Sequence, residues 1–256
     1  MFSEQFLIEV KLKRDKIADF SNYPFCLDAI KNFDKIRLHP SVTFFVGENG
    51  SGKSTLLEAV AVAAGFNPEG GSKNFSFSTQ DSHSELSQYI RLSRGIKKPR
   101  DGFFLRAESF YNVATEIQAL DNVPDEEKFG PPIINSYGGK SLHEQSHGES
   151  FMALLLNRFS GKSLYILDEP EAALSPARQL AMLARMHDLV GEGSQFIVAT
   201  HSPIIMAYPD ASIFVLDEDG IETTDYTDTE HYQITKQFMN NHGGMLDQLL
   251  EPEPDL

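Results

Sequence analysis

The sequence predicts an α/β fold with a mainly parallel sheet, and three observations support this prediction. Short runs of β-branched and aromatic residues alternate with longer runs of helical character, a pattern typical of strands joined by crossover helices. A glycine-rich turn separates an apolar run at residues 42–46 from a helical run at 54–64. A second apolar run, at 164–167, is followed by two adjacent carboxylates. Parallel sheets bind ligands at the edge formed by the C-terminal ends of their strands, where these carboxylates would lie.

The first half of the chain begins with two expected strands. Residues 6–12 predict an outer strand, and the sequence VTFFV at 42–46 predicts a buried one because both of its faces are apolar. The helix at 54–64 ends before Gly65, a typical C-terminal glycine. Residues 66–102 are rich in Gly, Ser, Asn, Gln and Lys without a clear period, which indicates hairpins or a mobile connector.

The second half continues the alternation and ends in a helical tail. A polar loop with prolines occupies residues 121–137. Residues 229–250 predict a helix broken near Gly243 and Gly244, which we expect to cover the chain's own core, with docking on a partner as the alternative. The other expected elements are a strand at 103–106, a helix at 109–120, a strand at 164–167, a helix from Pro176, and strands at 196–200 and 213–216.

Composition favours a cytoplasmic protein without a membrane span. The chain has 256 residues, 41% of them hydrophobic, which suits one well-filled core. A single cysteine, Cys26, excludes an intramolecular disulfide framework, and we do not expect the charged, alternating first residues to form a signal peptide. No apolar stretch approaches the roughly 18 to 20 residues that span a bilayer.

The formal net charge of −15 repels polyanions, so binding to nucleic acid is disfavoured unless positive charges are concentrated. Neither of the two basic clusters carries interleaved aromatic residues that could stack bases. We therefore interpret both as solvated faces or hairpin tips. The clusters are Lys11, Lys13, Arg14 and Lys16, and Arg91, Arg94, Lys97, Lys98 and Arg100.

The strongest chemical signal is the pattern GxxxxGK[ST] at residues 47–54, placed between a strand and a helix. Glycines let backbone N–H groups curl around phosphate oxygens, and the helix N-terminus adds a positive dipole. We expect Lys53 to reach the terminal phosphates of a nucleotide and the Ser54 hydroxyl to bind Mg²⁺. The nucleotide-binding candidates are Gly47, Glu48, Asn49, Gly50, Ser51, Gly52, Lys53, Ser54 and Thr55.

Two carboxylates and a histidine follow neighbouring strands. Asp168 is placed to hold Mg²⁺, and Glu169 can polarise the water that attacks the γ-phosphate. His201 follows the next strand, which in a parallel sheet brings its imidazole to the same edge. A lone histidine at a strand end is more often structural, but the convergence of a third polar group favours Glu169 and His201 as catalytic residues.

The order of P-loop, LYILDEPEAALSP and ATHSP resembles the ABC-type ATPase superfamily over about residues 42–217. The family's signature turn precedes the DE strand, and here the sequence QSHGE at 145–149 stands in its place. The resemblance implies that this turn and its helix face the γ-phosphate of ATP bound by a second copy. The signature candidates in trans are Ser146, His147, Gly148 and Glu149.

Several positions depart from the family's pattern. Gln145, His147 and Glu149 replace the usual leucine, glycine and glutamine of the signature. The sequence ALSP at 173–176 replaces the SALD of transporter members and resembles RecF-like, overcoming-lysogenization-type and uncharacterised bacterial ATPases. The whole run 136–209 resembles compact bacterial AAA-family or ABC-type ATPases. No transporter-type glutamine is evident; Glu108 stands nearest, either beside Mg²⁺ or as a helix N-terminal acid favoured by the dipole.

The resemblance implies one three-layer ABC-ATPase-like domain over residues 1–256 with an N-terminal antiparallel β region. Within it, 66–148 form a variable connector plus the signature region and 224–256 a C-terminal helical tail. ATP and Mg²⁺ would be bound between two copies, as a homodimer that forms with ATP. The expected function is a nucleotide-dependent dimerisation switch coupled to an unidentified effector. The alternatives are a DNA-repair-like ATPase, a transporter's ATP-binding subunit and a non-hydrolysing scaffold.

Overall fold

The computed structural model describes residues 5–73, 84–106, 110–122 and 131–251, and it confirms the α/β prediction. Its main sheet has seven strands in the order β10-β9-β3-β8-β7-β6-β4. The strands from β9 to β6 are parallel, and the two edge strands are antiparallel. The strands are β10 (Ile221–Thr224), β9 (Ser212–Leu216), β3 (Val42–Val46), β8 (Gln195–Ala199), β7 (Ser163–Asp168), β6 (Asp101–Arg106) and β4 (Gly71–Ser72).

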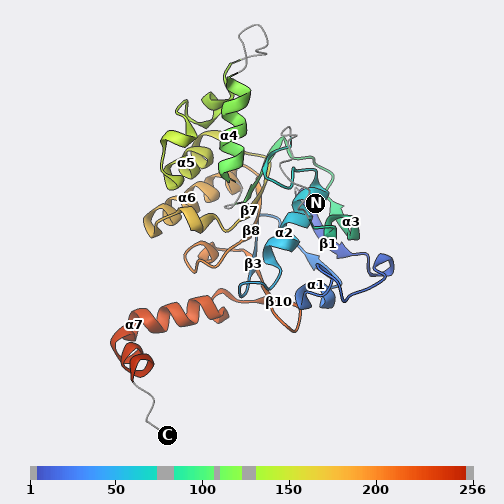
Figure 1. Cartoon of the computed structure of the whole chain (residues 1–256), viewed down its shortest axis with the longest axis vertical. Helices are drawn as coiled ribbons and strands as arrows, with labels where there is room; N and C mark the ends of the chain where they lie inside the picture. The colour runs from blue at the N-terminus through green and yellow to red at the C-terminus, as the bar shows by residue number, and fades with distance from the viewer. Residues whose placement is uncertain (1–4, 74–83, 107–109, 123–130, 252–256) are drawn as a thin grey trace.

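The strand alternation divides the core into two clusters, one on each face of the main sheet. On β3, Phe45 belongs to one cluster, while Val42 and Phe44 belong to the other. The helices α4, α5 and α6 cover the second face, and α2 and the small sheet cover the first (Figure 1). The helices are α1 (Asp28–Asn32), α2 (Lys53–Ala64), α3 (Leu86–Tyr89), α4 (Phe110–Asp121), α5 (His147–Ala153), α6 (Pro176–Gly191) and α7 (Glu230–Leu250).

Helix α2 lies between the two sheets. Leu56, Leu57 and Val60 are fully buried in one cluster with residues of the main sheet and of the small sheet. A helix that is apolar on all sides is stable only when neighbours cover all of it. The two sheets therefore hold α2, and the glycine-rich loop that precedes it, in one position.

The small antiparallel sheet has the order β2-β1-β5, with β2 at Lys35–Arg37, β1 at Leu7–Leu12 and β5 at Ile90–Arg94. Strand β5 and helix α3 lie within the segment for which the sequence shows no clear period. The pairing sets Lys11 beside both Lys35 and Arg91. These side chains are exposed, so the two basic clusters meet on one solvated face of this sheet.

Helix α7 corrects one expectation, because it does not cover the core of its own chain. None of its residues is buried, and it extends away from the body (Figure 1). Other elements already cover both faces of the main sheet, α2 with the small sheet on one and α4, α5 and α6 on the other. Its kink lies at Asn241, two residues before the predicted break. In the part of the chain that the structure describes, no helix is both long and apolar enough to cross a membrane.

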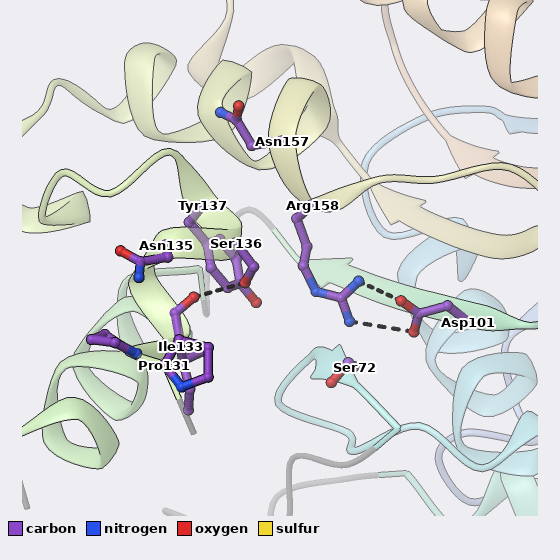
Figure 2. A pocket seen from close by; sticks show the side chains of 10 residues that line it. Ser72, Asp101, Pro131, Ile133, Asn135, Ser136, Tyr137, Asn157 and Arg158 are labelled. Carbon is purple, nitrogen blue, oxygen red and sulfur yellow. Dashed lines mark hydrogen bonds and ion pairs between the residues drawn. The ribbon is translucent and has the colours of Figure 1, made fainter. Parts of the chain in front are cut away.

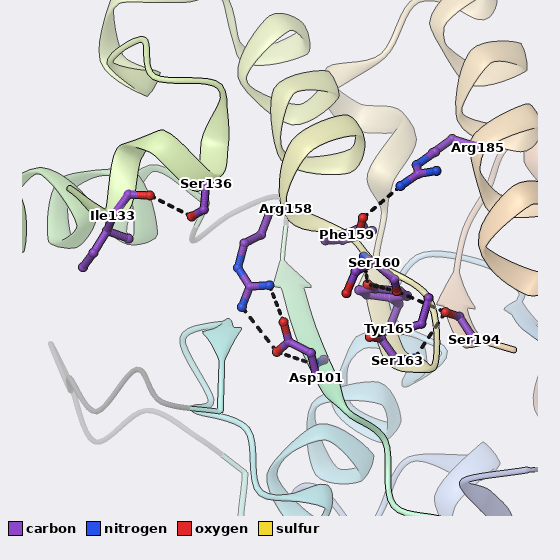
Figure 3. A network of polar contacts seen from close by, with 12 residues as sticks. Asp101, Ile133, Ser136, Arg158, Phe159, Ser160, Ser163, Tyr165, Arg185 and Ser194 are labelled. Atoms are coloured by element: carbon purple, nitrogen blue, oxygen red, sulfur yellow. Dashed lines mark hydrogen bonds and ion pairs between the residues drawn. The ribbon is translucent and has the colours of Figure 1, made fainter. Parts of the chain in front are cut away.

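A partly buried polar network anchors the segment that leads into β7. Arg158 donates two hydrogen bonds to Asp101, the first residue of β6, beside a cavity of about 560 Å³ (Figure 2). Burial raises the pKa of Tyr137, which lines this cavity, to about 12. The Tyr165 hydroxyl binds both the N–H and the carbonyl of Ser160 at 2.6 and 2.8 Å (Figure 3). These contacts attach the helical side of the molecule to the sheet.

We predict that Asp101→Asn lowers the free energy of unfolding at neutral pH by about 1–2 kcal/mol, because it leaves the Arg158 guanidinium without its anionic partner. Burial by itself would raise the pKa of Asp101, but the bonds from Arg158 and Gly102 hold it below its ordinary value. The loss should therefore shrink as the pH falls through the folded-state pKa. Urea denaturation of both proteins at several pH values measures this difference in the free energy of unfolding.

Lys98→Ala serves as the control for this measurement. Lys98 is exposed, and such surface substitutions change stability by less than about 0.5 kcal/mol. An unchanged free energy of unfolding in Asp101→Asn at neutral pH would show that the pair contributes nothing to stability.

Candidate functional site

The phosphate-binding loop connects β3 to α2 and depends on glycine at its first position. Gly47 has φ of 145°, and a Cβ there would lie 2.3 Å from the Leu216 carbonyl oxygen. Gly52 caps α2 in the left-handed region, with φ of 99°. Only glycine adopts these conformations without strain. The loop can therefore present its N–H groups and the positive end of α2 to a phosphate chain.

Lys53 folds back across this loop. Its side chain is 4% exposed, and Nζ donates to the carbonyls of Gly47 at 2.9 Å and Glu48 at 2.8 Å. Burial lowers the pKa of Lys53, while the nearby carboxylates of Glu169 and Asp168 act in the opposite direction. The ammonium group thus lies at the centre of the loop, where the sequence predicts the terminal phosphates.

Ser54 and Asp168 meet at the C-terminal edge of the sheet. The Ser54 hydroxyl, on the first turn of α2, donates to Asp168 Oδ1 at 3.0 Å, and Asp168 is the last residue of β7. A hydroxyl and a carboxylate are hard oxygen donors of the kind that Mg²⁺ prefers, with phosphates and water completing its shell. The residues present therefore fit the predicted Mg²⁺.

Glu169 has an unusual backbone conformation. Its φ and ψ are 48° and 53°, in the left-handed region that costs free energy for a residue other than glycine. Its N–H donates to the Ala199 carbonyl on β8 at 3.0 Å. This backbone turns the carboxylate toward His201, whose Nε2 lies 3.5 Å from Glu169 Oε1.

His201 is held on two sides. Its backbone N–H donates to Glu171 Oε1 at 2.5 Å, and its ring Nδ1 lies 3.1 Å from His231 Nε2. The other ring nitrogen, Nε2, is buried without a hydrogen-bond partner. Burial first, and then the positive charge of Lys53, lower the pKa of His201. The lowered pKa favours the neutral imidazole at pH 7.

Two residues of this site, Glu171 and His231, were missed by the sequence reasoning. Burial raises the pKa of Glu171, and its Oε2 is buried without a partner. Its place two residues after Glu169 was a local signal that it could contribute. His231 carried no such signal, because it lies 30 residues after His201 in the helical tail.

A cavity of about 370 Å³ opens beside the P-loop, and P-loop residues and Glu169 line it. Tyr23 stands on its rim, 64% exposed, with its hydroxyl 3.1 Å from Thr55 Oγ1. Phe25 instead packs in the core against Tyr89. Tyr23, unlike Phe25, therefore lines the cavity.

The signature candidates form the start of α5. Ser146 is its N-cap, and Ser146 and Glu149 form a reciprocal capping box. Ser146, His147 and Glu149 are exposed, whereas Gly148 is buried. A Cβ on Gly148 would lie 2.6 Å from the carbonyl oxygen of Ala173, so glycine permits close packing on the segment after the DE pair. The predicted metal contact Glu108 lies outside the described residues.

We predict that Glu171→Gln raises the denaturant midpoint at about pH 8 and leaves it unchanged at about pH 4. Because the folded-state pKa of Glu171 is raised above 4.5, its ionisation at higher pH opposes folding, and this cost is absent when the carboxyl is protonated. The amide oxygen still accepts from the His201 N–H. A midpoint that is unchanged or lower at the higher pH would contradict this account.

The family comparisons agree with the site. A family model described as "AAA domain" matches residues 16–136, and one described as "AAA domain, putative AbiEii toxin, Type IV TA system" matches residues 141–207. Among curated proteins, the chain is 26% identical over 208 residues to the "Energy-coupling factor transporter ATP-binding protein EcfA" of Methanosphaera stadtmanae, covering 77% of this chain and 73% of the relative.

Further relatives carry similar names. The chain is 26% identical over 189 residues to a "Putative ABC transporter ATP-binding protein" of Caldanaerobacter subterraneus, covering 70% of this chain and 78% of the relative. Solved structures include the "SMC head domain from Thermotoga maritima" (16% identity, TM-score 0.43, 86% of this chain and 100% of that one). Another is cbiO1 from Clostridium perfringens, "Part of the ABC transporter complex cbiONQ" (18% identity, TM-score 0.46, covering 97% of this chain and 100% of that one).

These TM-scores lie below 0.5 and add no weight to the assignment. The curated relatives bear transporter names, whereas the sequence features favoured a RecF-like branch, so the matches support the superfamily and not one branch within it. The P-loop geometry, the two family models and the curated relatives agree in one respect: the chain is similar to ATP-binding P-loop proteins of the ABC/AAA ATPase type.

Proposed function

We propose that this protein hydrolyses ATP in a Mg²⁺-dependent reaction, at a site that a second copy completes. The observation that carries the proposal is the convergence of five side chains at one edge of the main sheet. They come from the first turn of α2 and from the ends of β7 and β8. The side chains are Lys53, Ser54, Asp168, Glu169 and His201.

Each of these residues has a role that follows from its chemistry. Lys53 and the loop N–H groups bind the phosphate chain, and Ser54 and Asp168 hold Mg²⁺, which supplies charge neutralisation to the phosphates when bound. Glu169 orients the attacking water and accepts its proton. The free Nε2 of His201 donates to a γ-phosphate oxygen.

The second copy would supply its signature turn, Ser146 to Glu149, above the γ-phosphate. In the single chain the Glu149 carboxylate already accepts from the Ser146 N–H at 2.9 Å and its hydroxyl at 2.8 Å. A phosphate would compete with this carboxylate for the same donors and be repelled by its charge. Closure of the dimer therefore requires Glu149 to swing away, and Arg178, 4.0 Å from Glu149 Oε1, is placed to receive it.

The names of the relatives favour the transporter alternative over a free-standing switch. We therefore infer that the protein works as the ATP-hydrolysing subunit of an assembly, with a separate membrane component as the first candidate partner. Fractionation of cells expressing a tagged chain tests this inference. Tagged protein retained on washed membranes, and released with one membrane protein after detergent, would support it, and full recovery in the supernatant would contradict it.

The central prediction concerns Glu169→Gln, which removes the proton acceptor and keeps the shape of the side chain. ATP turnover should fall at least about 100-fold. The variant should form a dimer with MgATP, because ATP that is not hydrolysed keeps two copies together. Turnover assays and the mass in solution, with and without MgATP, measure the two effects.

Lys53→Ala is the control, because it should abolish ATP binding and therefore both turnover and dimer formation. Wild-type turnover close to that of Lys53→Ala would disprove hydrolysis by this chain alone. A Glu169→Gln variant that binds MgATP and stays monomeric would disprove the composite site.

A further inference from the structure

The first turn of α7 is attached to the segment that carries His201. His231 Nε2 lies 3.1 Å from His201 Nδ1. The Tyr226 hydroxyl, just before α7, donates to the Pro203 carbonyl at 2.9 Å. The N-cap Thr229 is 2% exposed, and its hydroxyl lies 3.5 Å from Met206 Sδ. The start of this helix is therefore fixed to the strand end at which the site is built.

The rest of α7 has no comparable attachment. None of its residues is buried, and Met239, two turns after His231, is 73% exposed. The position of His231 therefore depends on the few contacts of the first turn, and the bond to His201 is lost if this turn moves.

The bond between the two histidines has a chemical consequence. A neutral imidazole carries one proton, so His201 can donate from Nε2 only if Nδ1 is an acceptor. A donor at His231 Nε2 stabilises that tautomer and fixes the plane of the His201 ring. A group that only accepts at this position would favour the opposite tautomer, whose Nε2 cannot donate to a phosphate oxygen.

We propose that His231 is a positioning residue that holds the His201 ring in the tautomer and orientation needed for ATP turnover. Turnover therefore depends on the contacts that hold the first turn of α7 against the segment carrying His201. The inference rests on the proposed function, because it assigns His201 a part in the reaction. His231 itself contacts His201 and is not placed against the nucleotide.

Two substitutions in the full chain test the proposal. His231→Leu removes the donor and should lower kcat for ATP about 10-fold, in line with losses seen when partners of functional histidines are removed. KM for ATP should stay within about twofold, because the P-loop is unchanged. His231→Gln offers an amide donor at similar reach and should restore most of kcat. Gln237→Leu, an exposed position on the following turn, should behave like the wild type.

Ring ¹⁵N spectra of His201 give a readout that does not need turnover. The wild type and His231→Gln should show a proton mainly on Nε2, and His231→Leu a mixture of tautomers. Identical spectra, or equal losses of kcat in His231→Leu and His231→Gln, would overturn the proposal. If the wild type does not hydrolyse ATP, the proposed function fails, while the spectra still decide whether His231 sets the His201 tautomer.

Discussion

The burial of α2 between the two sheets is the constraint on which the rest of the structure depends. Its apolar side chains are shared between a core with the main sheet and a contact with the small antiparallel sheet. A helix held on opposite sides can neither slide nor tilt without opening cavities in both contacts. The P-loop is attached to the N-terminus of this helix and to the end of β3. Its position relative to the sheet edge is therefore set by packing, before any nucleotide is bound.

Parallel register brings the remaining groups to this edge. Strand β8 lies between β3 and β7, and Ala199 is level with both Phe45 and Asp168. The residues that follow these strands, from Gly47, Glu169 and Thr200 onward, therefore emerge side by side. The strained backbone of Glu169 is tolerated because its N–H is bonded to β8, and the packed strands supply the free energy that the strain costs. Rigid strands hold the proposed catalytic groups, and among these groups Glu169 alone has a positive φ.

The two parts of the molecule that face outward are different in character from this core. The signature turn and α7 are exposed, and both make polar contacts that can be exchanged. Glu149 accepts from Ser146, which we propose faces the nucleotide of a second copy, and His231 lies against His201, which we propose contacts the nucleotide of its own chain. The His231 contact links the site to an exposed helix, and the Glu149 contact lies in the exposed signature turn. A rigid nucleotide site combined with exchangeable contacts at its border is suited to a subunit whose turnover is governed by its neighbours.

The sequence by itself determined the α/β class, the strand at 42–46, the P-loop helix and the polar residues at three strand ends. These features follow from local patterns such as glycine spacing and apolar runs. Any parallel sheet brings the polar residues at its strand ends to one edge. Only the tertiary structure decided the pairing of β5 with β1, which joins segments about 80 residues apart, and the exposure of α7. The contact between His201 and His231 also required the fold, since strand pairing, burial and side-chain contacts between distant segments depend on which surfaces remain uncovered once the core has formed.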